Sequence, residues 1–164
     1  MISIQIKDVK NFMSCLLMGS TFDFLYVTEI SLTTFNTFTI NGHLNQKYYT
    51  EDELTELNNT QFSSWKMLKP VCYNLIKGNK TPERFKITFC LGKDDYDKMI
   101  KNSGASLTAE NITGLYVHFT YENGVLSGIT ATSLSIFTMD KTLDKYWDET
   151  IKNFLVKHFD IEVL

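Results

Sequence analysis

The stretch Tyr121–Leu134, YENGVLSGITATSL, is typical of a β-hairpin. Its Asn123-Gly124 pair favours a two-residue type I′ turn, because both central residues of that turn need positive φ angles. Before the turn, the apolar residues Leu115, Val117 and Phe119 alternate with more polar ones, as in a strand with one buried face. The stretch therefore predicts two antiparallel strands joined by a tight turn.

An earlier part of the chain resembles this hairpin. Leu25–Leu44 aligns without a gap with Leu115–Leu134, and both segments begin with Leu-Tyr-Val and end with Leu. The alignment places Thr33-Thr34 over Asn123-Gly124 as a turn. Asn41-Gly42 falls at the next turn position and predicts a second hairpin turn. These matches predict an internal repeat.

The other elements follow from hydrophobic periodicity and capping signals. Val9–Leu17 forms an apolar helical stripe behind Asp8, and Trp65–Ile76 forms another behind Ser63 or Ser64. Pro70 predicts a kink in the latter helix, or its first turn. Further helices are expected after the capping box at 50–53 and at 96–100 and 143–155. Strands are expected at 2–6, 22–32, 35–40, 43–49, 85–91, 115–121, 125–134, 134–138 and 159–164, and a loop at 79–82.

These elements predict an α+β domain over residues 1–164 with an antiparallel sheet. It is built from two β-α-β-β(-β)-α halves, about 1–80 and 83–164, related by a pseudo-two-fold axis. This order, clearest at NGVLSGITATSLSIFTMD (Asn123–Asp140), resembles the processivity fold of DNA sliding clamps. Clamps form rings of six such domains with basic ring-lining helices, whereas the helices here mix Lys and Asp. The whole chain also resembles an uncharacterised bacterial family known only as a domain of unknown function, which implies no activity.

Composition narrows the classes of function. The net charge of −3 argues against a broad nucleic-acid footprint. Arg84 is the single arginine, which excludes polyphosphate chemistry that rests on several arginine clamps. No apolar run is long enough to span a membrane, so we expect no membrane partner. The three dispersed cysteines match neither a disulfide framework nor a zinc site and predict reduced thiols in the cytoplasm.

Motifs for catalysis are missing from the sequence. The three histidines lack metal-ligand spacing, and neither a nucleophile elbow nor a Gly-rich phosphate loop occurs. The acidic clusters Glu51–Glu53 and Asp94-Asp95 are expected in first turns of helices, where carboxylates complement the helix dipole. We therefore expect no catalytic residue, no bound metal and no cofactor, and we favour a protein that is not an enzyme.

Two sets of residues remain as candidate binding sites. The first lies on the more polar face of the strand that precedes the opening turn, and its members are Tyr116, His118 and Thr120. The second is a local basic patch that suits contact with phosphate groups: Lys66, Lys69, Lys77, Lys80 and Lys86.

Three functional hypotheses follow. The leading hypothesis is a non-enzymatic cytoplasmic module for binding or assembly, which contacts a protein partner or a second copy through a sheet face or edge. The clamp resemblance implies, as an alternative, a DNA-associated protein, although the charge distribution disfavours it. The third is a small enzyme with a pocket near His118, which predicts a shifted histidine pKa.

Overall fold

A computed structural model describes residues 1–58, 60–78 and 80–164 of the chain. Within these residues, eight strands form one antiparallel sheet in the order β3-β2-β5-β6-β7-β1-β8, and the short β4 also pairs with β2. The α+β class with an antiparallel sheet is therefore confirmed. The strands are β1 (Ser3–Ile6), β2 (Tyr26–Thr33), β3 (Thr37–Asn41), β4 (Ser63–Ser64), β5 (Arg84–Cys90), β6 (Ile112–Glu122), β7 (Val125–Leu134) and β8 (Ile161–Val163).

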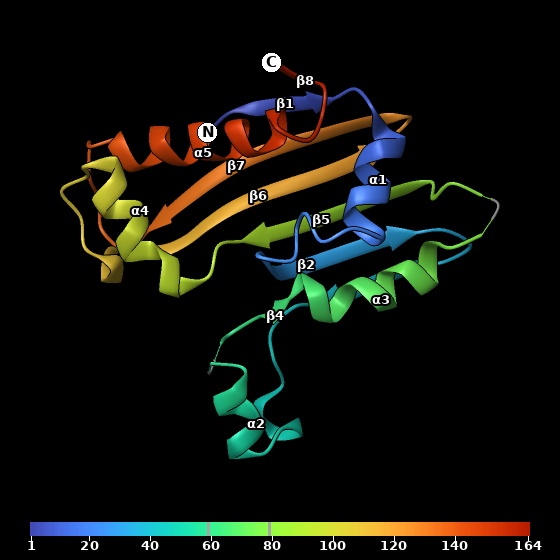
Figure 1. Cartoon of the computed structure of the whole chain (residues 1–164), viewed down its shortest axis with the longest axis horizontal. Helices are drawn as coiled ribbons and strands as arrows, with labels where there is room; N and C mark the ends of the chain where they lie inside the picture. Colours follow the sequence, from blue (N-terminus) through green and yellow to red (C-terminus); the bar gives the residue numbers. More distant parts are fainter. Residues whose placement is uncertain (59, 79) are drawn as a thin grey trace.

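The α-helices other than α2 (Glu51–Glu56) gather on one face of this sheet, whereas α2 projects away from it (Figure 1). Antiparallel pairing places Leu115, Val117 and Phe119 of β6 on that face, where all three are buried, whereas Tyr116 and His118 point to the other face. The helices are α1 (Val9–Leu17), α2 (Glu51–Glu56), α3 (Trp65–Ile76), α4 (Tyr96–Ser103) and α5 (Thr142–Val156), with 3-10 turns η1 (Gln46–Tyr48), η2 (Lys93–Asp95) and η3 (Ala109–Asn111).

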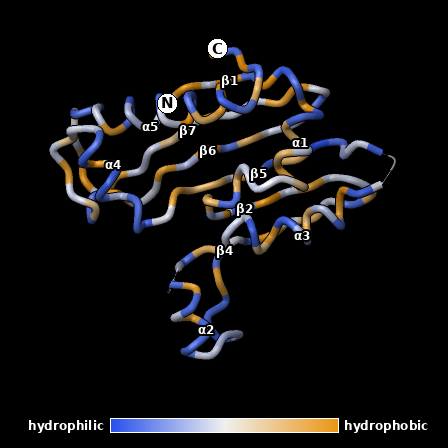
Figure 2. Tube along the Cα trace, viewed as in Figure 1, coloured by the Kyte–Doolittle hydropathy of each residue, from blue (hydrophilic) through white to orange (hydrophobic). Residues whose placement is uncertain are grey.

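Aromatic side chains fill the layer between helices and sheet. Phe12 of α1 packs against Phe119 of β6 and against Phe22, which precedes β2, with ring centroids 5.0 and 5.3 Å apart. Trp65 of α3 donates its indole N–H to Leu16 O, and Trp147 of α5 donates to Tyr116 O, each at 2.9 Å. The alternation of apolar and polar residues along the strands is visible in Figure 2. Helix packing thus buries one face and leaves the other without a helical layer.

A buried polar network ties the start of the chain to α5. Thr130 of β7, 1% exposed, donates its hydroxyl proton to Asp148 Oδ1 at 2.5 Å and accepts the Ile2 N–H at 2.9 Å. The other carboxylate oxygen of Asp148 accepts the N-terminal ammonium of Met1 at 2.8 Å. The Thr130 hydroxyl therefore links β7, β1 and α5. The Asp148 carboxylate needs these hydrogen-bond partners because it is largely shielded from water.

The opening hairpin is confirmed. Asn123 and Gly124 have φ angles of 53° and 78°, the positive values that a type I′ turn needs, and Glu122 pairs with Val125 across the turn. The capping box of α2 is also confirmed: the Glu53 N–H donates to Thr50 Oγ1, and the Thr50 N–H donates to Glu53 Oε2. Both are local signals, and both appear where the sequence places them.

The second hairpin signal, Asn41-Gly42, was wrong. The β2–β3 turn lies over Thr34–Asn36, and Gly42 continues past β3 with its N–H donating to Thr28 O at 2.9 Å. A Cβ on Gly42 would lie 1.8 Å from the carbonyl oxygen of Val27. Glycine is needed here because the chain passes close to the irregularity in β2, and not because it forms a turn.

Three more expectations are corrected. Residues 43–49 form an isolated bridge from His43 to Phe62 and then η1, rather than a strand. Residues 22–25 form turns and not strand, although Phe22 and Leu25 are fully buried, which explains their strand-like pattern. Strand β7 ends at Leu134 and bends follow it, so the proposed strand over 134–138 does not form.

The helix around Pro70 begins earlier than that residue. Trp65 is its first residue, and the Ser64 hydroxyl accepts the Met67 N–H at 3.3 Å as the cap. Pro70 therefore lies inside α3 and does not mark its first turn. The loop expected at 79–82 starts at Asn79, which lies outside the described residues.

Both segments of the proposed repeat contain a hairpin, β2–β3 and β6–β7. The first strands of the two halves pair differently. β5 pairs with β6 of its own half, whereas β1 pairs with β7 and β8. The repeat, its pseudo-two-fold axis and the division of one domain into halves stay predictions.

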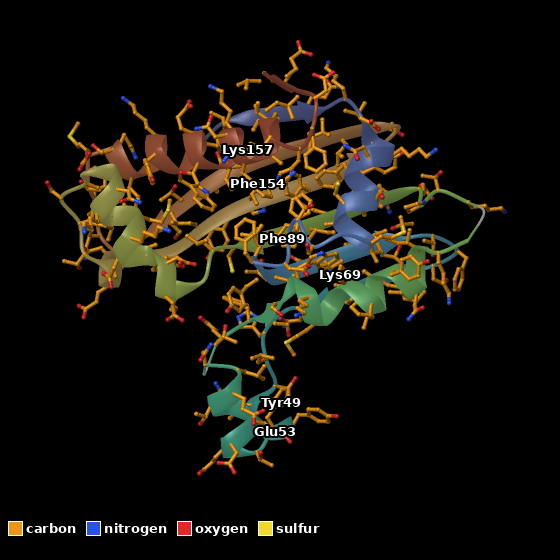
Figure 3. The ribbon with its side chains drawn as sticks, in the orientation of Figure 1. Tyr49, Glu53, Lys69, Phe89, Phe154 and Lys157 are labelled. Atoms are coloured by element: carbon orange, nitrogen blue, oxygen red, sulfur yellow. The ribbon has the colours of Figure 1, made fainter. Side chains whose placement is uncertain are left out.

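Residues 43–58 and 60–62 form an arm that projects from the sheet and carries η1 and α2 (Figure 1). No residue of η1 or α2, all of which lie in the described part, is buried. Tyr49 and Glu53 lie on this arm, far from Phe89 and Phe154 in the packed layer (Figure 3). The arm returns to the sheet at β4, whose Ser64 pairs with Tyr26.

Candidate functional site

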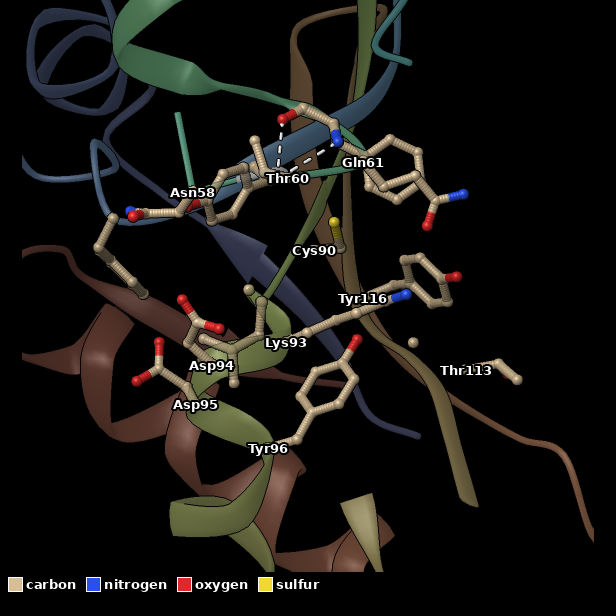
Figure 4. A pocket seen from close by; sticks show the side chains of 16 residues that line it. Asn58, Thr60, Gln61, Cys90, Lys93, Asp94, Asp95, Tyr96, Thr113 and Tyr116 are labelled. Carbon is tan, nitrogen blue, oxygen red and sulfur yellow. Dashed lines mark hydrogen bonds between the residues drawn. The ribbon is translucent and has the colours of Figure 1, made fainter. Parts of the chain in front are cut away.

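A cavity of about 270 Å³ lies at the end of the sheet where β5 finishes and β6 begins (Figure 4). Strand ends form its floor, the η2–α4 junction one side, and the returning part of the arm another. The described residues that line it are Phe24, Tyr26, Asn58, Thr60, Gln61, Phe62, Cys90, Leu91, Gly92, Lys93, Asp94, Asp95, Tyr96, Thr113, Gly114 and Tyr116.

Two glycines allow aromatic rings to lie directly on the backbone at this cavity. A Cβ on Gly92 would lie 2.7 Å from Cε2 of Tyr26, and a Cβ on Gly114 would lie 2.1 Å from Cζ of Tyr116. Real Cβ atoms do not come this close to other atoms, so a larger residue at either position would displace the neighbouring ring. The walls of the cavity are therefore set by the backbone as well as by side chains.

Tyr96 begins α4 and is only 4% exposed. Burial, with smaller contributions from Cys90 and Tyr116, raises the pKa of Tyr96 to about 12, and burial also raises the pKa of Tyr116. Both phenols are therefore neutral at pH 7 and can donate a hydrogen bond. The hydroxyls of Tyr26, Tyr96 and Tyr116 form no side-chain hydrogen bond within residues 1–58, 60–78 and 80–164.

Charges of both signs surround the opening. Asp94 and Asp95 lie on one side, and the Lys93 side chain reaches toward Tyr116 (Figure 4). All three residues are exposed, and none forms an ion pair with another described residue. Their charges are therefore available to a ligand.

The cavity lacks an activated nucleophile. Cys90 lies in its wall, but burial raises the pKa of this thiol to about 12, and the pKa of Cys72 is raised equally by burial. A thiol with such a pKa stays protonated and unreactive at neutral pH. Within the described residues, no group of three His, Cys, Asp or Glu side chains could hold a metal ion. The geometry is suited to binding.

The first predicted set is only partly at this cavity. Tyr116 lines it, whereas His118 and Thr120 lie further along the same face of β6 and are not among its lining residues. His118 Nδ1 lies 3.0 Å from the hydroxyl of Thr88 on β5. Burial, and then the nearby ammonium of Lys86, lower the pKa of His118. The three side chains thus form a row along the uncovered face, and a site there stays a prediction.

The predicted basic patch is divided by the fold. Lys69 of α3 donates to Asp23 Oδ1 at 2.7 Å and to Gly19 O at 2.8 Å, so its charge is paired within the protein. Lys86 lies on the face of β5 opposite the helices. Lys77 and Lys80 line a second cavity, of about 440 Å³, beside the β2–β3 turn. Lys66 is exposed on α3.

Sequence reasoning missed the cavity because its walls come from distant parts of the chain. Tyr26 and Tyr96 were expected only as parts of a strand and a helix, and Tyr116 was predicted as a binding residue together with His118 and Thr120 instead of with these two tyrosines. A usable signal was present in the pairing of glycine with aromatic residues near strand ends, as in Gly114 and Tyr116. Which ring covers which glycine follows only from the sheet register.

The β3 edge of the sheet is a second surface with binding features. Its sequence, TFTIN, has no charge and no proline, and Thr37, Thr39 and Asn41 are exposed. Phe35, at the adjoining turn, is 83% exposed and contacts the Phe38 ring at 5.6 Å. Natural sheets usually protect such edges with Lys, Pro or bulges.

These features define a mixed α+β protein with one open sheet face, a cavity at its end and an unprotected edge. Comparison with family models shows that the chain belongs to a family of unknown function (DUF5721), whose model covers residues 15–163. Neither the curated proteins nor the solved structures include a match. No relative therefore supplies a function, and the clamp-like topology stays a prediction. Among the described helices, none has the length and apolar character needed to cross a membrane.

Proposed function

We propose that this protein is a non-enzymatic assembly module that pairs with a second copy of itself through the β3 edge. The observation that carries the proposal is the uncharged, exposed edge strand Thr37–Asn41 with the exposed Phe35 beside it. Unpaired backbone groups along such an edge form hydrogen bonds with an added strand, and neighbouring side chains supply specificity.

The direction of the backbone groups supports this pairing. The Gly42 N–H donates toward β2, to Thr28 O. Because backbone N–H groups alternate in direction along a strand, those of Thr39 and Asn41 point away from β2 toward the free edge. They are the donors that a second strand would use.

An antiparallel pair of identical strands is self-complementary about a two-fold axis. With the axis at Thr39, this residue faces its own copy, and Phe38 faces Ile40 of the second copy. Phe38 and Ile40 are already packed against the core on the helix side. Pairing would therefore extend the apolar layer across the interface and place Thr39 on the open face.

The opposite edge is less suited to this role. β8 has three residues, and its Glu162 forms an ion pair with Lys7 of the segment after β1. A short edge with paired charges resists the addition of another strand. This contrast favours a symmetric β3–β3 dimer over a ring in which β3 of one copy meets β8 of the next.

For the compartment, we propose a bacterial cytoplasm. Cys15, Cys72 and Cys90 are all free thiols, which supports a reducing environment. The high thiol pKa values at Cys72 and Cys90 support a role without nucleophilic catalysis. An enzyme that uses His118 is the alternative that the lowered pKa of this residue favours, since a neutral imidazole can act as a base.

The dimer is tested by sedimentation equilibrium over a range of protein concentrations. We expect the wild type to form a dimer, and we expect Thr39→Lys and Thr39→Glu each to remain monomeric, because like charges would face each other across the axis. A mixture of the two variants should recover the dimer, since opposite charges then meet. Ser127→Lys, on the same face of the central strand β7, is the matched control and should behave as the wild type.

A monomeric wild type, or a Thr39→Lys variant that still forms dimers, would contradict edge pairing. The same samples are titrated with duplex DNA at low and moderate salt. We expect no salt-sensitive binding. A ring-sized mass together with salt-sensitive DNA binding would instead support the clamp-like alternative.

A further inference from the structure

We propose that the cavity at the end of β5 and β6 binds a free α-amino acid with an apolar side chain. This inference is independent of self-assembly through β3. The cavity combines carboxylates, an ammonium group, a buried phenol and aromatic walls around about 270 Å³. These groups match the three parts of such a ligand: its ammonium, its carboxylate and its side chain.

Tyr96 is the central observation. Its side chain is almost fully buried, and its hydroxyl points into the cavity (Figure 4). This hydroxyl has no side-chain hydrogen-bond partner in the described part of the chain. The ring is buried while the hydroxyl faces the cavity and not an acceptor in the described residues, so it is free to donate a hydrogen bond to a bound molecule.

The charged side chains at the cavity opening match a zwitterionic ligand. Asp94 and Asp95 stand on one side of Tyr96, while the Lys93 side chain reaches toward Tyr116 on the other (Figure 4). A ligand ammonium group matches the two carboxylates. A ligand carboxylate matches the Lys93 ammonium and the Tyr96 hydroxyl, which donate charge-assisted hydrogen bonds. A purely anionic ligand would meet two carboxylates, and a purely cationic one would leave Lys93 without a partner.

The remaining walls combine aromatic and apolar side chains with polar ones, among them Thr60, Gln61 and Thr113. Phe24, Phe62 and Leu91 line the cavity together with the rings of Tyr26 and Tyr116. The volume is slightly below the range typical of drug-sized ligands, about 300–1,000 Å³, and suits a smaller metabolite. An aliphatic or aromatic side chain would replace water against these surfaces.

Isothermal titration calorimetry of the full chain with L-leucine tests the proposal. Two analogues separate its parts: 3-methylbutan-1-amine lacks the carboxylate, and 4-methylpentanoate lacks the ammonium group. We expect L-leucine to bind and each analogue to bind about tenfold more weakly or worse, because each leaves charged groups unpaired. L-phenylalanine tests whether an aromatic side chain also fits.

Variants place the ligand in this cavity. Tyr96→Phe removes one hydroxyl and keeps the ring, and the double variant Asp94→Asn, Asp95→Asn removes two charges. Each should weaken leucine binding about tenfold or more. Asp97→Asn and Lys98→Met, on exposed positions of α4 that do not line the cavity, are the matched controls and should leave binding unchanged.

No heat of binding with either amino acid up to about 10 mM would overturn the proposal, since that concentration exceeds the weakest affinities of ordinary metabolite sites. Equal binding of leucine and both analogues would overturn the zwitterion assignment. Thr39→Lys should bind leucine as well as the wild type does, so failure of the dimer and failure of this site are separate results.

Discussion

Replacing Thr130 with valine tests the buried network that joins β1, β7 and α5. Valine has nearly the shape of threonine but no hydroxyl. The substitution removes the 2.5 Å hydrogen bond to Asp148 Oδ1 and also the acceptor of the Ile2 N–H. Both lost bonds lie in a region where Thr130 is 1% exposed and Asp148 is 8% exposed, so water does not replace them easily.

The expected cost follows from these two bonds. A hydrogen bond to a charged group contributes roughly 1.5–3 kcal/mol, and a stranded backbone N–H costs about 1 kcal/mol or more. Thr130→Val should therefore lower the free energy of unfolding by roughly 3 kcal/mol. In a domain of this size, that change lowers Tm by roughly 6–12 °C.

Thr130→Ser is the matched comparison, because it keeps the hydroxyl and removes one buried methyl group. Its cost should be roughly 1 kcal/mol. Urea unfolding followed by tryptophan fluorescence measures both variants, since Trp65 and Trp147 are buried and report the loss of packing. If the valine variant proves as stable as the serine variant, or more stable, the hydroxyl does not stabilise the fold in this way.

Three other outcomes are expected. Gly42→Ala should lower the free energy of unfolding by roughly 2–4 kcal/mol in the same assay, because its Cβ would overlap a β2 carbonyl; a neutral effect would contradict the close approach. The His118 ring, followed by NMR, should titrate below the ordinary value of about 6.5, and Lys86→Gln should raise its midpoint. Because folding lowers the pKa of His118, protonation of this ring favours the unfolded state. The contribution of His118 to stability is therefore complete above about pH 6.5 and is lost as the pH falls through the lowered pKa. A midpoint that is not shifted would rule out this pH dependence. A thiol-specific reagent should modify Cys15 in the native protein and the two buried thiols only after unfolding, and rapid native reaction of all three would contradict their burial.

Local signals predicted local structure well. Asn123-Gly124 formed its turn, and Thr50 and Glu53 formed their capping box, because each depends on a few adjacent residues. Gly42 was misinterpreted because its role is a contact with β2, which the sequence does not reveal. A glycine needed for a turn and one needed for a close approach look identical in sequence.

The binding surfaces were harder to predict, because they too depend on contacts between residues that are far apart in the sequence. Lys69 and Lys86 seemed to share a patch, but α3 and β5 present them on opposite sides of the sheet, and Lys69 is already paired with Asp23. Tyr96 was expected only as part of a helix core. Its hydroxyl became a candidate ligand group once the fold placed Tyr96 in one cavity with Cys90 of β5 and Tyr116 of β6.

The projecting arm between β3 and β4 has a consequence for how this protein can diversify. Because η1 and α2 contribute no buried residue, the stretch that they occupy can change in length or sequence at little cost to the core. The returning residues Thr60–Phe62 are different, since they form part of the cavity wall. The exposed part of the arm that carries η1 and α2 can therefore vary while Thr60–Phe62 stay constrained. Substitutions in that exposed part offer a route to a new specificity without a new fold.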